Sequence, residues 1–310
     1  MTDNNMSDTP RAKSVFIIIP VFNRKDTTLE CLERLSSFGY LQQPYQVVVV
    51  DDASTDGTAE AIRDRFCDVK VLTGDGDLWW TGGIVMGMKY AFEAGADYCV
   101  WLNDDCLPDA ETLPTMVKFA NENPRTIVGP SCFSLESGVW TIRNSASTGR
   151  QGYAGKAGET VYVNALSGWC VLIPRTVVAK IGLPDVRRFP HYDADIMYVL
   201  RATRAGFKAC ILGDAKVKVL DESGKEHPRR VFRNYFGRNL GPKETFSALF
   251  LSKKSPYRIP SQFPYHTVRH GYLIGVPLFA MKLATWLFKW VRLQILSQLG
   301  AGPFRTENSH

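Results

Sequence analysis

The sequence predicts an α/β fold, with a mostly parallel central sheet flanked by helices. Short runs of β-branched and aromatic residues alternate with longer segments of helical periodicity. Two such runs are Val15 to Pro20 and Val47 to Val50. Between them Leu29, Leu32 and Leu35 recur at three-residue spacing, which is typical of one helix face. Because strand, helix and strand in this order form the unit of a parallel sheet, we expect helices on both sheet faces.

The alternation continues through the first third of the chain. Helices are expected near Thr58 to Phe66 and Gly83 to Glu93, and strands at Val69 to Leu72 and Tyr98 to Leu102. In open sheets of this kind, ligands bind beyond the carboxyl ends of the strands. The polar residues that follow these strands are therefore candidates for the chemistry.

Beyond residue 107 the pattern is less regular. Helices are expected over Glu111 to Asn121 and Ile196 to Ala205, short strands within residues 130–158, and a further strand at Lys208 to Leu212. Gly206 supplies a stop for the second of these helices.

The composition indicates a folded cytoplasmic protein. With 310 residues, of which 45% are hydrophobic, the chain can bury a full core. The seven cysteines form no C-x-x-C pair, which fits a reducing compartment. The first dozen residues lack the apolar stretch of a secretory signal, and no uncharged apolar run approaches the roughly 20 residues that span a bilayer. We therefore expect neither export nor a membrane span.

Charge is distributed unevenly along the chain. The formal net charge is +6, yet the segment from Lys225 onward carries fourteen Lys and Arg against three acids. This favours a polyanionic partner, either anionic lipid or nucleic acid, and an ordinary solvated face is the alternative.

A basic amphipathic helix is expected from 277 to 299, where Lys282, Lys289 and Arg292 lie opposite Trp286 and Trp290. Such a helix can lie in the headgroup region of an anionic membrane surface. The alternatives are packing on its own domain or on the partner of a homodimer.

The triplet Asn103-Asp104-Asp105 directly follows the predicted strand at 98–102. Two adjacent carboxylates repel each other unless a cation neutralises them. Hard oxygen ligands suit Mg²⁺ or Mn²⁺, which then bridges to phosphate oxygens. The alternative is that these acids only form an Asx turn or cap the next helix.

A second acidic cluster occupies residues 51–58, also after a strand. Ser54 or Asp56 is suited to cap the helix that follows. Capping needs only one acid, so Asp51 and Asp52 remain available to bind a base or ribose, as acids do in other nucleotide-binding sheets.

Three segments together resemble the N-terminal signatures of family 2 glycosyltransferases, in the same order and at the usual separations. They are Ile17 to Asn23, the Asp51-Asp52-x-Ser54-x-Asp56-Gly57-Thr58 stretch and Asn103-Asp104-Asp105. The resemblance covers about residues 14 to 235 and looks like the rhamnosyltransferase-like bacterial members. It implies a GT-A fold, a nucleoside-diphosphate sugar donor and direct displacement with inversion at the anomeric carbon.

The resemblance also implies roles for the residues at the strand ends. Those that would line the nucleotide pocket are Pro20, Phe22 and Asn23, with Asp52 at the pyrimidine. Asp51 stays a donor-binding candidate because of its place at the strand end. Asp104 would lie near the ribose or donor sugar, and Asp105 would hold the metal. A diphosphate leaves only if its growing charge is matched, which is work for a metal ion and for positioning.

Two further segments border the donor and the acceptor in similar proteins. Trp79, Trp80 and Gly82 lie between the third predicted strand and the next helix, where the tryptophans contact the donor or, alternatively, fill the core. Gly168 and Trp169 resemble the acceptor-side segment, in which the tryptophan stacks on a sugar or packs in the core.

Inversion requires a general base that takes the proton of the acceptor hydroxyl. The family's base is an acid just ahead of a helix that carries Arg-x-x-x-x-Gly, a pattern that Arg201 and Gly206 fit. Asp195, six residues before Arg201, matches the base, and Asp193 is the reserve. The alternative role of Asp195 is a helix N-cap.

Two histidines complete the candidate site. His191 precedes the candidate base and would contact the acceptor, a phosphate or the metal, and His227 would contact the metal or a phosphate. A lone histidine is more often structural.

These expectations divide the chain into a flexible tail at 1–13, a catalytic domain at 14–235 and a helical membrane-associating or dimerising extension at 236–310. Within the catalytic domain, 14–107 is the nucleotide-binding half and 108–235 the acceptor half.

The expected activity is transfer of a sugar from a UDP- or dTDP-sugar, dTDP-rhamnose included, to a lipid-linked or polysaccharide acceptor in cell-surface glycan assembly, at the inner face of the cell membrane. A nucleotidyltransferase is the alternative enzyme, but Pro20 to Asn23 stands where its Gly-rich basic loop would be. A non-catalytic membrane- or nucleic-acid-binding protein leaves the acidic strand ends unexplained, because acidic loops repel phosphate. We therefore expect no nucleic-acid partner.

Overall fold

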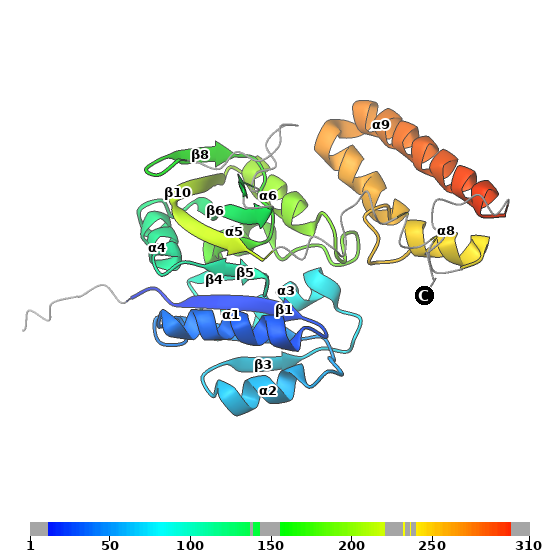
Figure 1. Cartoon of the computed structure of the whole chain (residues 1–310). Coiled ribbons are helices and arrows are strands. Elements are labelled where there is room, and N and C mark those ends of the chain that lie inside the picture. Colours follow the sequence, from blue (N-terminus) through cyan, green and yellow to red (C-terminus); the bar gives the residue numbers. More distant parts are fainter. Residues whose placement is uncertain are drawn as a thin grey trace, which may run out of the picture.

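A ten-stranded mixed sheet forms the centre of the molecule, in the order β3-β2-β1-β4-β9-β6-β10-β5, with β7 paired to β6 and β8 to β10. The computed structural model describes residues 12–136, 139–142, 156–220, 232, 236 and 240–298. Figure 1 shows helices packed along this sheet and two C-terminal helical elements beside it. The predicted α/β class is confirmed.

The N-terminal half is the regular part of the sheet. Its parallel strands are β1 (Val15–Val21), β2 (Tyr45–Asp51), β3 (Lys70–Thr73) and β4 (Tyr98–Leu102). The connecting helices are α1 (Lys25–Ser37), α2 (Thr58–Arg65) and α3 (Trp79–Glu93). Because successive strand residues point to opposite faces, Ile17 and Ile19 join the core layer of α1, whereas Phe16 and Ile18 join that of α3.

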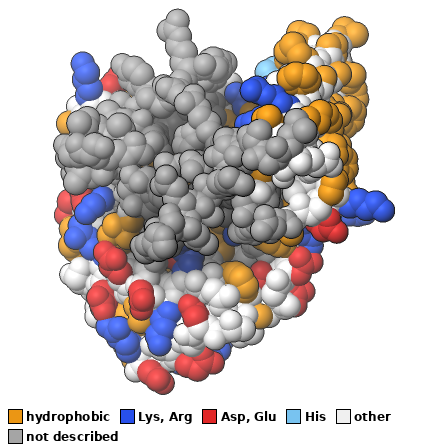
Figure 2. Space-filling view, turned by 45° about the vertical axis from the view of Figure 1, so that its right-hand side comes forward, with side chains coloured by type: hydrophobic (Ala, Val, Ile, Leu, Met, Phe, Trp, Pro, Cys, Tyr) orange, Lys and Arg blue, Asp and Glu red, His pale blue; other side chains and the backbone are white. Residues whose placement is uncertain are grey.

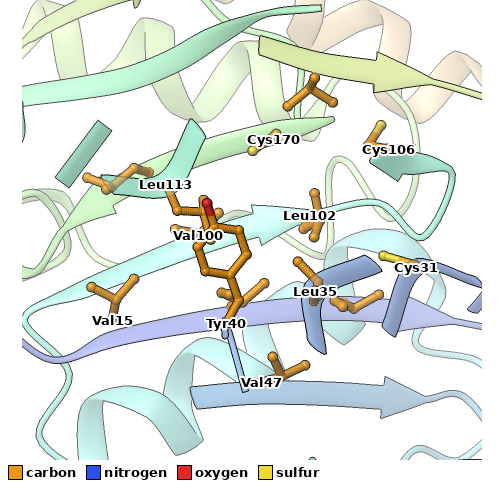
Figure 3. Packing of buried hydrophobic residues seen from close by; sticks show 14 of the residues in the cluster. Val15, Cys31, Leu35, Tyr40, Val47, Val100, Leu102, Cys106, Leu113 and Cys170 are labelled. Carbon is orange, nitrogen blue, oxygen red and sulfur yellow. The ribbon is translucent and has the colours of Figure 1, made fainter. Parts of the chain in front are cut away.

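The layer on the α1 side contains a buried tyrosine at its centre (Figure 3). The ring of Tyr40 lies among aliphatic side chains that include Val15, Leu35 and Val100, and only 2% of its surface is exposed. Its hydroxyl donates a hydrogen bond to the carbonyl oxygen of Ala110 at 2.5 Å, so the buried polar atom is satisfied.

Helix α3 begins at Trp79, four residues before the predicted start at Gly83. The paired tryptophans therefore stand in its first turn and not in the preceding loop. Glycine lets this helix approach the sheet closely, because a Cβ on Gly83 would lie 2.9 Å from Cβ of Pro20, and one on Gly87 2.4 Å from Cγ2 of Ile18.

The second half brings antiparallel pairs into the sheet. Its strands are β5 (Cys106–Pro108), β6 (Thr126–Glu136), β7 (Val139–Ile142), β8 (Thr160–Val163), β9 (Cys170–Pro174) and β10 (Lys208–Val219). Its helices are α4 (Thr112–Glu122), α5 (Arg175–Ile181) and α6 (Ala194–Arg204). Strand β9 pairs antiparallel with both β4 and β6, which joins the two halves into one sheet.

Three of these elements differ from the sequence expectation. Strand β10 continues past Leu212 to Val219, because an irregularity between Leu212 and Lys216 lets it resume pairing with β6. Helix α5 was not predicted, since seven residues are too few to reveal a helical period. Helix α6 begins at Ala194, so Asp195 lies in its first turn and is not its N-cap.

The C-terminal elements are α8 (Pro242–Phe250) and α9 (Ile259–Gln298). Gly271, at φ 74° and ψ 164°, interrupts α9, and we call its two arms, 259–270 and 272–298, the α9 hairpin. A Cβ on Gly275 would lie 2.4 Å from the carbonyl oxygen of His266, so the arms touch at this glycine. Figure 1 shows the two arms side by side.

By length and hydropathy, α9 could cross a membrane, and 11% of its most apolar 18-residue window is buried. The sequence expectation rested on a different criterion, an uncharged apolar run, which Lys282 breaks, whereas the mean hydropathy of an 18-residue window tolerates one such charge. Gly271 interrupts this helix, but the arm after the break, 272–298, is by itself longer than the roughly 20 residues that a span needs.

The predicted tryptophan face of this helix is directed inward. Trp286, Trp290 and Leu293 pack against a cluster formed by Phe232 and by Leu249 and Phe250 of α8. The indole Nε1 of Trp290 also donates a hydrogen bond to Oγ1 of Thr245, at 3.2 Å. This face therefore packs on its own chain, which was the alternative to the bilayer.

Candidate active site

A cavity of about 880 Å³ opens at the carboxyl ends of β1, β2 and β4. It brings together residues of the segments that the sequence singled out, among them Pro20, Phe22, Asn23, Asp52, Trp79, Trp80, Asn103, Asp104, Asp105 and His191. Parallel strands end at one edge of a sheet, which explains why motifs far apart in sequence meet there.

The loop after β1 is tied to the loop after β2 by Asn23. Its φ is 51°, its backbone N–H donates to Oγ of Ser54 at 2.8 Å, and its side-chain Oδ1 accepts from the N–H of Thr55 at 2.7 Å. Phe22, by contrast, is 53% exposed and presents its ring in the cavity. Asn23 therefore shapes the pocket, and the neighbouring aromatic ring is available to a ligand.

The two acids that end β2 have different environments. Asp51 is buried outside the cavity lining, where Oδ1 accepts from the N–H of Ser54 at 3.0 Å. Asp52 lines the cavity, and its two oxygens accept from the N–H groups of Gly76 at 2.8 Å and Trp79 at 3.0 Å. Asp52 thus holds the segment that leads into α3 against the pocket.

Arg24 stands between the two acids of the triplet. Its Nε lies 2.8 Å from Oδ2 of Asp104, and its Nη2 lies 3.3 Å from Oδ2 of Asp105. Asp104 is 4% exposed and also accepts a hydrogen bond from Oγ1 of Thr28 at 3.1 Å. Burial raises the pKa of Asp104 to about 6, although the Arg24 charge and hydrogen bond oppose the shift.

The sequence interpretation missed Arg24 and Thr28. It recognised that two adjacent carboxylates need a cation, but it considered only a metal ion. Arg24 directly follows the first motif, and a search for basic residues at the same sheet edge would have found it.

The donor set at this edge fits a divalent cation only if a ligand supplies most of the coordination. Among the described residues, no three His, Cys, Asp or Glu side chains are grouped as a metal site. Asp105 lines the cavity with a partly exposed carboxylate. Mg²⁺ is commonly held by one or two carboxylates plus substrate phosphates and water, and this arrangement matches that chemistry.

Trp79 and Trp80 occupy different places. Trp79 has φ 56°, its Nε1 donates to Oδ1 of Asp77 at 2.8 Å, and its ring meets that of His191 edge-on at 5.9 Å between centroids. Trp80 donates from Nε1 to Oδ1 of Asn103 at 2.8 Å. Gly82 is buried in α3 against Leu78 and does not line the cavity.

The candidate base, Asp195, lies behind Trp80. A Cβ on Gly168 would lie 2.5 Å from the Trp80 ring and 3.0 Å from Cβ of Asp195, so only glycine fits between them. The N–H groups of Gly168 and Ile196 donate to the Asp195 carboxylate at 2.5 Å and 2.8 Å. Burial raises the pKa of Asp195, and these hydrogen bonds oppose the shift.

Asp193, the reserve base, is contacted by a side chain of the C-terminal helix α9. Its φ is 67°, and its Oδ2 accepts a hydrogen bond from Nε2 of Gln262 in α9 at 2.8 Å. Burial and the neighbouring Asp195 raise the pKa of Asp193 to about 7. Asp193 and Asp195 thus lie at one site, and α9 contributes a partner to it.

Three predicted residues remain. Trp169 packs against the core layer of α1, and its carbonyl accepts from the N–H of Asn103 at 3.0 Å. His191 lines the cavity between Trp79 and Tyr192. His227 lies outside the described residues. Lys254, which the sequence did not single out, also lines the cavity.

Comparisons with known proteins extend this picture. The undecaprenyl-phosphate 4-deoxy-4-formamido-L-arabinose transferase of Yersinia enterocolitica is 28% identical over 122 residues, which are 38% of this chain and 36% of that protein. Glycosyltransferase AglE of Haloferax volcanii is 25% identical over 208 residues, which are 64% of each chain. The matched part thus spans less than two thirds of each relative.

Two solved structures share the GT-A-like fold. A structure of GalNAc-T7 with UDP, GalNAc and Mn²⁺ has a TM-score of 0.56 at 14% identity, covering 96% of this chain and 60% of that one. TarS of S. aureus has a TM-score of 0.53 at 16% identity, covering 76% and 42%. Residues 16–182, more than half of the chain, match the family model described as glycosyl transferase family 2. The chain therefore belongs to glycosyl transferase family 2.

Proposed function

We propose that the protein is an inverting glycosyltransferase that moves a sugar from a UDP- or dTDP-sugar, with dTDP-rhamnose as the first candidate, to a lipid-linked or polysaccharide acceptor in cell-surface glycan biosynthesis. One observation carries the proposal. Trp80 lines the acid-lined cavity, and Gly168 packs between the Trp80 ring and the Asp195 carboxylate, to which its N–H donates. A donor pocket and a proton acceptor on neighbouring elements are what a direct displacement requires.

The donor nucleotide would occupy the end formed by Phe22 and Asp52. The exposed ring of Phe22 offers a stacking surface, and Asp52 keeps its carboxylate at the cavity while its oxygens accept backbone N–H groups. Asp104, whose carboxyl is buried beside Arg24, would face the ribose or the donor sugar.

The diphosphate would lie at Asp105. A divalent cation, Mg²⁺ or Mn²⁺, held there would neutralise the charge that develops on the departing diphosphate. Arg24 adds a fixed positive charge 3.3 Å from the Asp105 carboxylate. The Mn²⁺ in the GalNAc-T7 structure supports a metal in this role. His227 stays a further candidate ligand.

Asp195 would take the proton of the acceptor hydroxyl while the hydroxyl oxygen bonds to the anomeric carbon and the bond to the diphosphate breaks. The N–H groups of Gly168 and Ile196 fix the orientation of its carboxylate before the acceptor arrives. Gly168, Trp169 and His191 would lie on the acceptor side, and Asp193 is the reserve base.

The names of the relatives guide the acceptor class. The Yersinia relative is named as an undecaprenyl-phosphate 4-deoxy-4-formamido-L-arabinose transferase. Another relative, from Bacillus spizizenii, is named as a poly(ribitol-phosphate) beta-glucosyltransferase and is 26% identical over 117 residues. We propose a lipid-linked or polysaccharide acceptor, and accordingly a peripheral location at the inner face of the cell membrane. The α9 hairpin is the candidate membrane anchor, and the alternative role for this hairpin is to form a homodimer.

The decisive experiment measures donor turnover across a panel of UDP- and dTDP-sugars with Mg²⁺, Mn²⁺ or chelator. We expect one donor to be hydrolysed or transferred only with the cation. Asp105→Ala should abolish cation-dependent binding of the nucleoside diphosphate, because it removes the carboxylate that we propose holds the cation. If no donor is consumed and Asp105→Ala binds nucleotide like the wild type, the proposed function is wrong.

A further inference from the structure

The outer face of the α9 hairpin is apolar, exposed and distinct from its tryptophan face. Ile274, Met281, Phe288 and Ile295 recur every seven residues, with Pro277, Ala284 and Val291 three residues after the first three of them. All seven are exposed, and Phe288 is 72% exposed. We call these residues the outer stripe. At a rise of about 1.5 Å per residue, it is roughly 30 Å long.

The stripe continues onto the tip of the hairpin. Next to the break at Gly271, Tyr272 is 73% exposed and Leu273 is 93% exposed. Figure 2 shows hydrophobic side chains gathered along the hairpin, at the upper right of that view. Soluble surfaces rarely carry a contiguous apolar patch of this extent unless it binds something.

The inner face of the hairpin is already bound to the rest of the chain. Trp286 and Trp290 pack on α8, and Gln294 donates from Nε2 to Oγ1 of Thr245 at 2.6 Å. On the other arm, Arg204 of α6 donates to the carbonyl oxygen of Val268 at 2.6 Å. A hairpin held in this way along both arms presents only its outer side to a partner.

Charge identifies the class of that partner. Between Glu244 and Glu307 the chain has no acidic residue, while it has eight Lys and Arg. Three of these cations, Lys282, Lys289 and Arg292, stand on the same arm as the stripe and are exposed. A second copy would bring like charges together along the seam, whereas an anionic bilayer offers both an apolar interior and opposite charge.

We infer that the outer stripe and the hairpin tip insert into the headgroup and upper acyl region of an anionic bilayer, with the hairpin lying in the membrane plane. The inference deepens the proposed membrane association and rests on it, but it concerns a surface separate from the catalytic cavity. It assigns lipid contact to the face opposite the tryptophans. In-plane insertion, unlike crossing, keeps the contacts of both arms with α6 and α8.

The test compares variants of the 310-residue chain that carry the same added charge at different faces. Met281→Glu and Phe288→Glu lie on the stripe, and Ser297→Glu is the matched control, exposed on the same arm but on the opposite side. Co-sedimentation would use vesicles of phosphatidylcholine with phosphatidylglycerol, and vesicles of phosphatidylcholine alone. Circular dichroism and nucleotide binding would establish that each variant is folded.

We expect each stripe variant to lower partitioning onto the mixed vesicles by at least about tenfold, from the loss of one buried apolar side chain. Ser297→Glu should stay within about twofold of the wild type, and phosphatidylcholine alone should bind less of every protein. Equal losses in all three variants, or none in the stripe variants, would overturn the inference. So would a wild-type dimer, measured by light scattering, that the stripe variants dissociate without any change in vesicle binding.

This readout is separate from catalysis. A protein that binds vesicles through the stripe but turns over no nucleotide sugar would refute the proposed function and keep the inference. A protein that turns over a nucleotide sugar, but whose stripe variants still bind vesicles, would support the proposed function and refute the inference.

Discussion

Asp195 is the residue on which the proposed chemistry depends most. Replacing it with Asn preserves its shape and its hydrogen-bond acceptor toward Gly168 but removes the proton acceptor. We expect kcat to fall by about 10²- to 10⁴-fold while the Kd of the donor nucleotide is unchanged. Steady-state kinetics and nucleotide titration would measure the two effects. Full activity in Asp195→Asn, with loss in Asp193→Asn, would transfer the role to Asp193.

Asp193 predicts a pH dependence of stability. Its folded-state pKa is raised to about 7, above the ordinary value near 4, so the native state binds more protons than the unfolded state between these values. The free energy of unfolding should therefore decrease as pH rises through this window. Asn mimics the neutral carboxyl, so Asp193→Asn should gain stability relative to the wild type as the pH goes from 5 to 8.

Urea denaturation of both proteins at these two pH values would measure the difference. The pKa of Asp104 is also raised, to about 6, so this group lowers the free energy of unfolding in the same direction, with rising pH, over a lower pH range. Because Asp104 is present in both proteins, its contribution cancels in the comparison. A difference between variant and wild type that is independent of pH would contradict the assigned environment of Asp193.

At the scale of elements, the packing of α3 on the sheet depends on its glycines. Gly87→Ala would place a Cβ 2.4 Å from Ile18, which is fully buried and cannot move away, so we expect a loss of about 1–3 kcal/mol in the free energy of unfolding. Gly82→Ala is the matched control in the same helix. Its Cβ would meet only the side chain of Leu78, at 3.0 Å, and the helix propensity of Ala offsets that contact.

Chemical denaturation of the two variants would test the close approach directly. Similar stabilities for Gly87→Ala and Gly82→Ala would mean that the helix is less tightly packed than its glycines indicate.

Helices and strands could be predicted from the sequence where apolar residues recur with a regular helical or strand spacing. The strands and helices up to β4 came from alternating apolar runs, and their bounds moved by a few residues only. Helix α3 is the exception, because Trp79 and Gly82 are poor helix signals, and tertiary contacts with the sheet decide their conformation. The turn at Gly271 was not predicted, since the apolar pattern runs through it.

At the scale of the whole molecule, the uneven charge predicts how membrane binding responds to salt. Attraction between the cations of α9 and anionic lipid is screened as ionic strength rises, whereas insertion of the apolar stripe is not. We expect partitioning onto mixed vesicles to fall several-fold between low and high salt and then to level off. Co-sedimentation at a series of NaCl concentrations would check this. Binding that is independent of salt would exclude a contribution from the cations.

The sequence by itself determined the α/β class, the family and the position of acids at the strand ends, because periodicity and short motifs are encoded within about ten neighbouring residues. Only the tertiary structure decided which groups meet. Arg24 reaches Asp104 across 80 residues, and Gly168 donates to Asp195 across 27. The same holds for α9, where the pattern predicted one apolar face, that of the tryptophans, and contacts with α8 decided that this face is buried. These outcomes depend on where distant elements dock, and a local pattern does not carry that information.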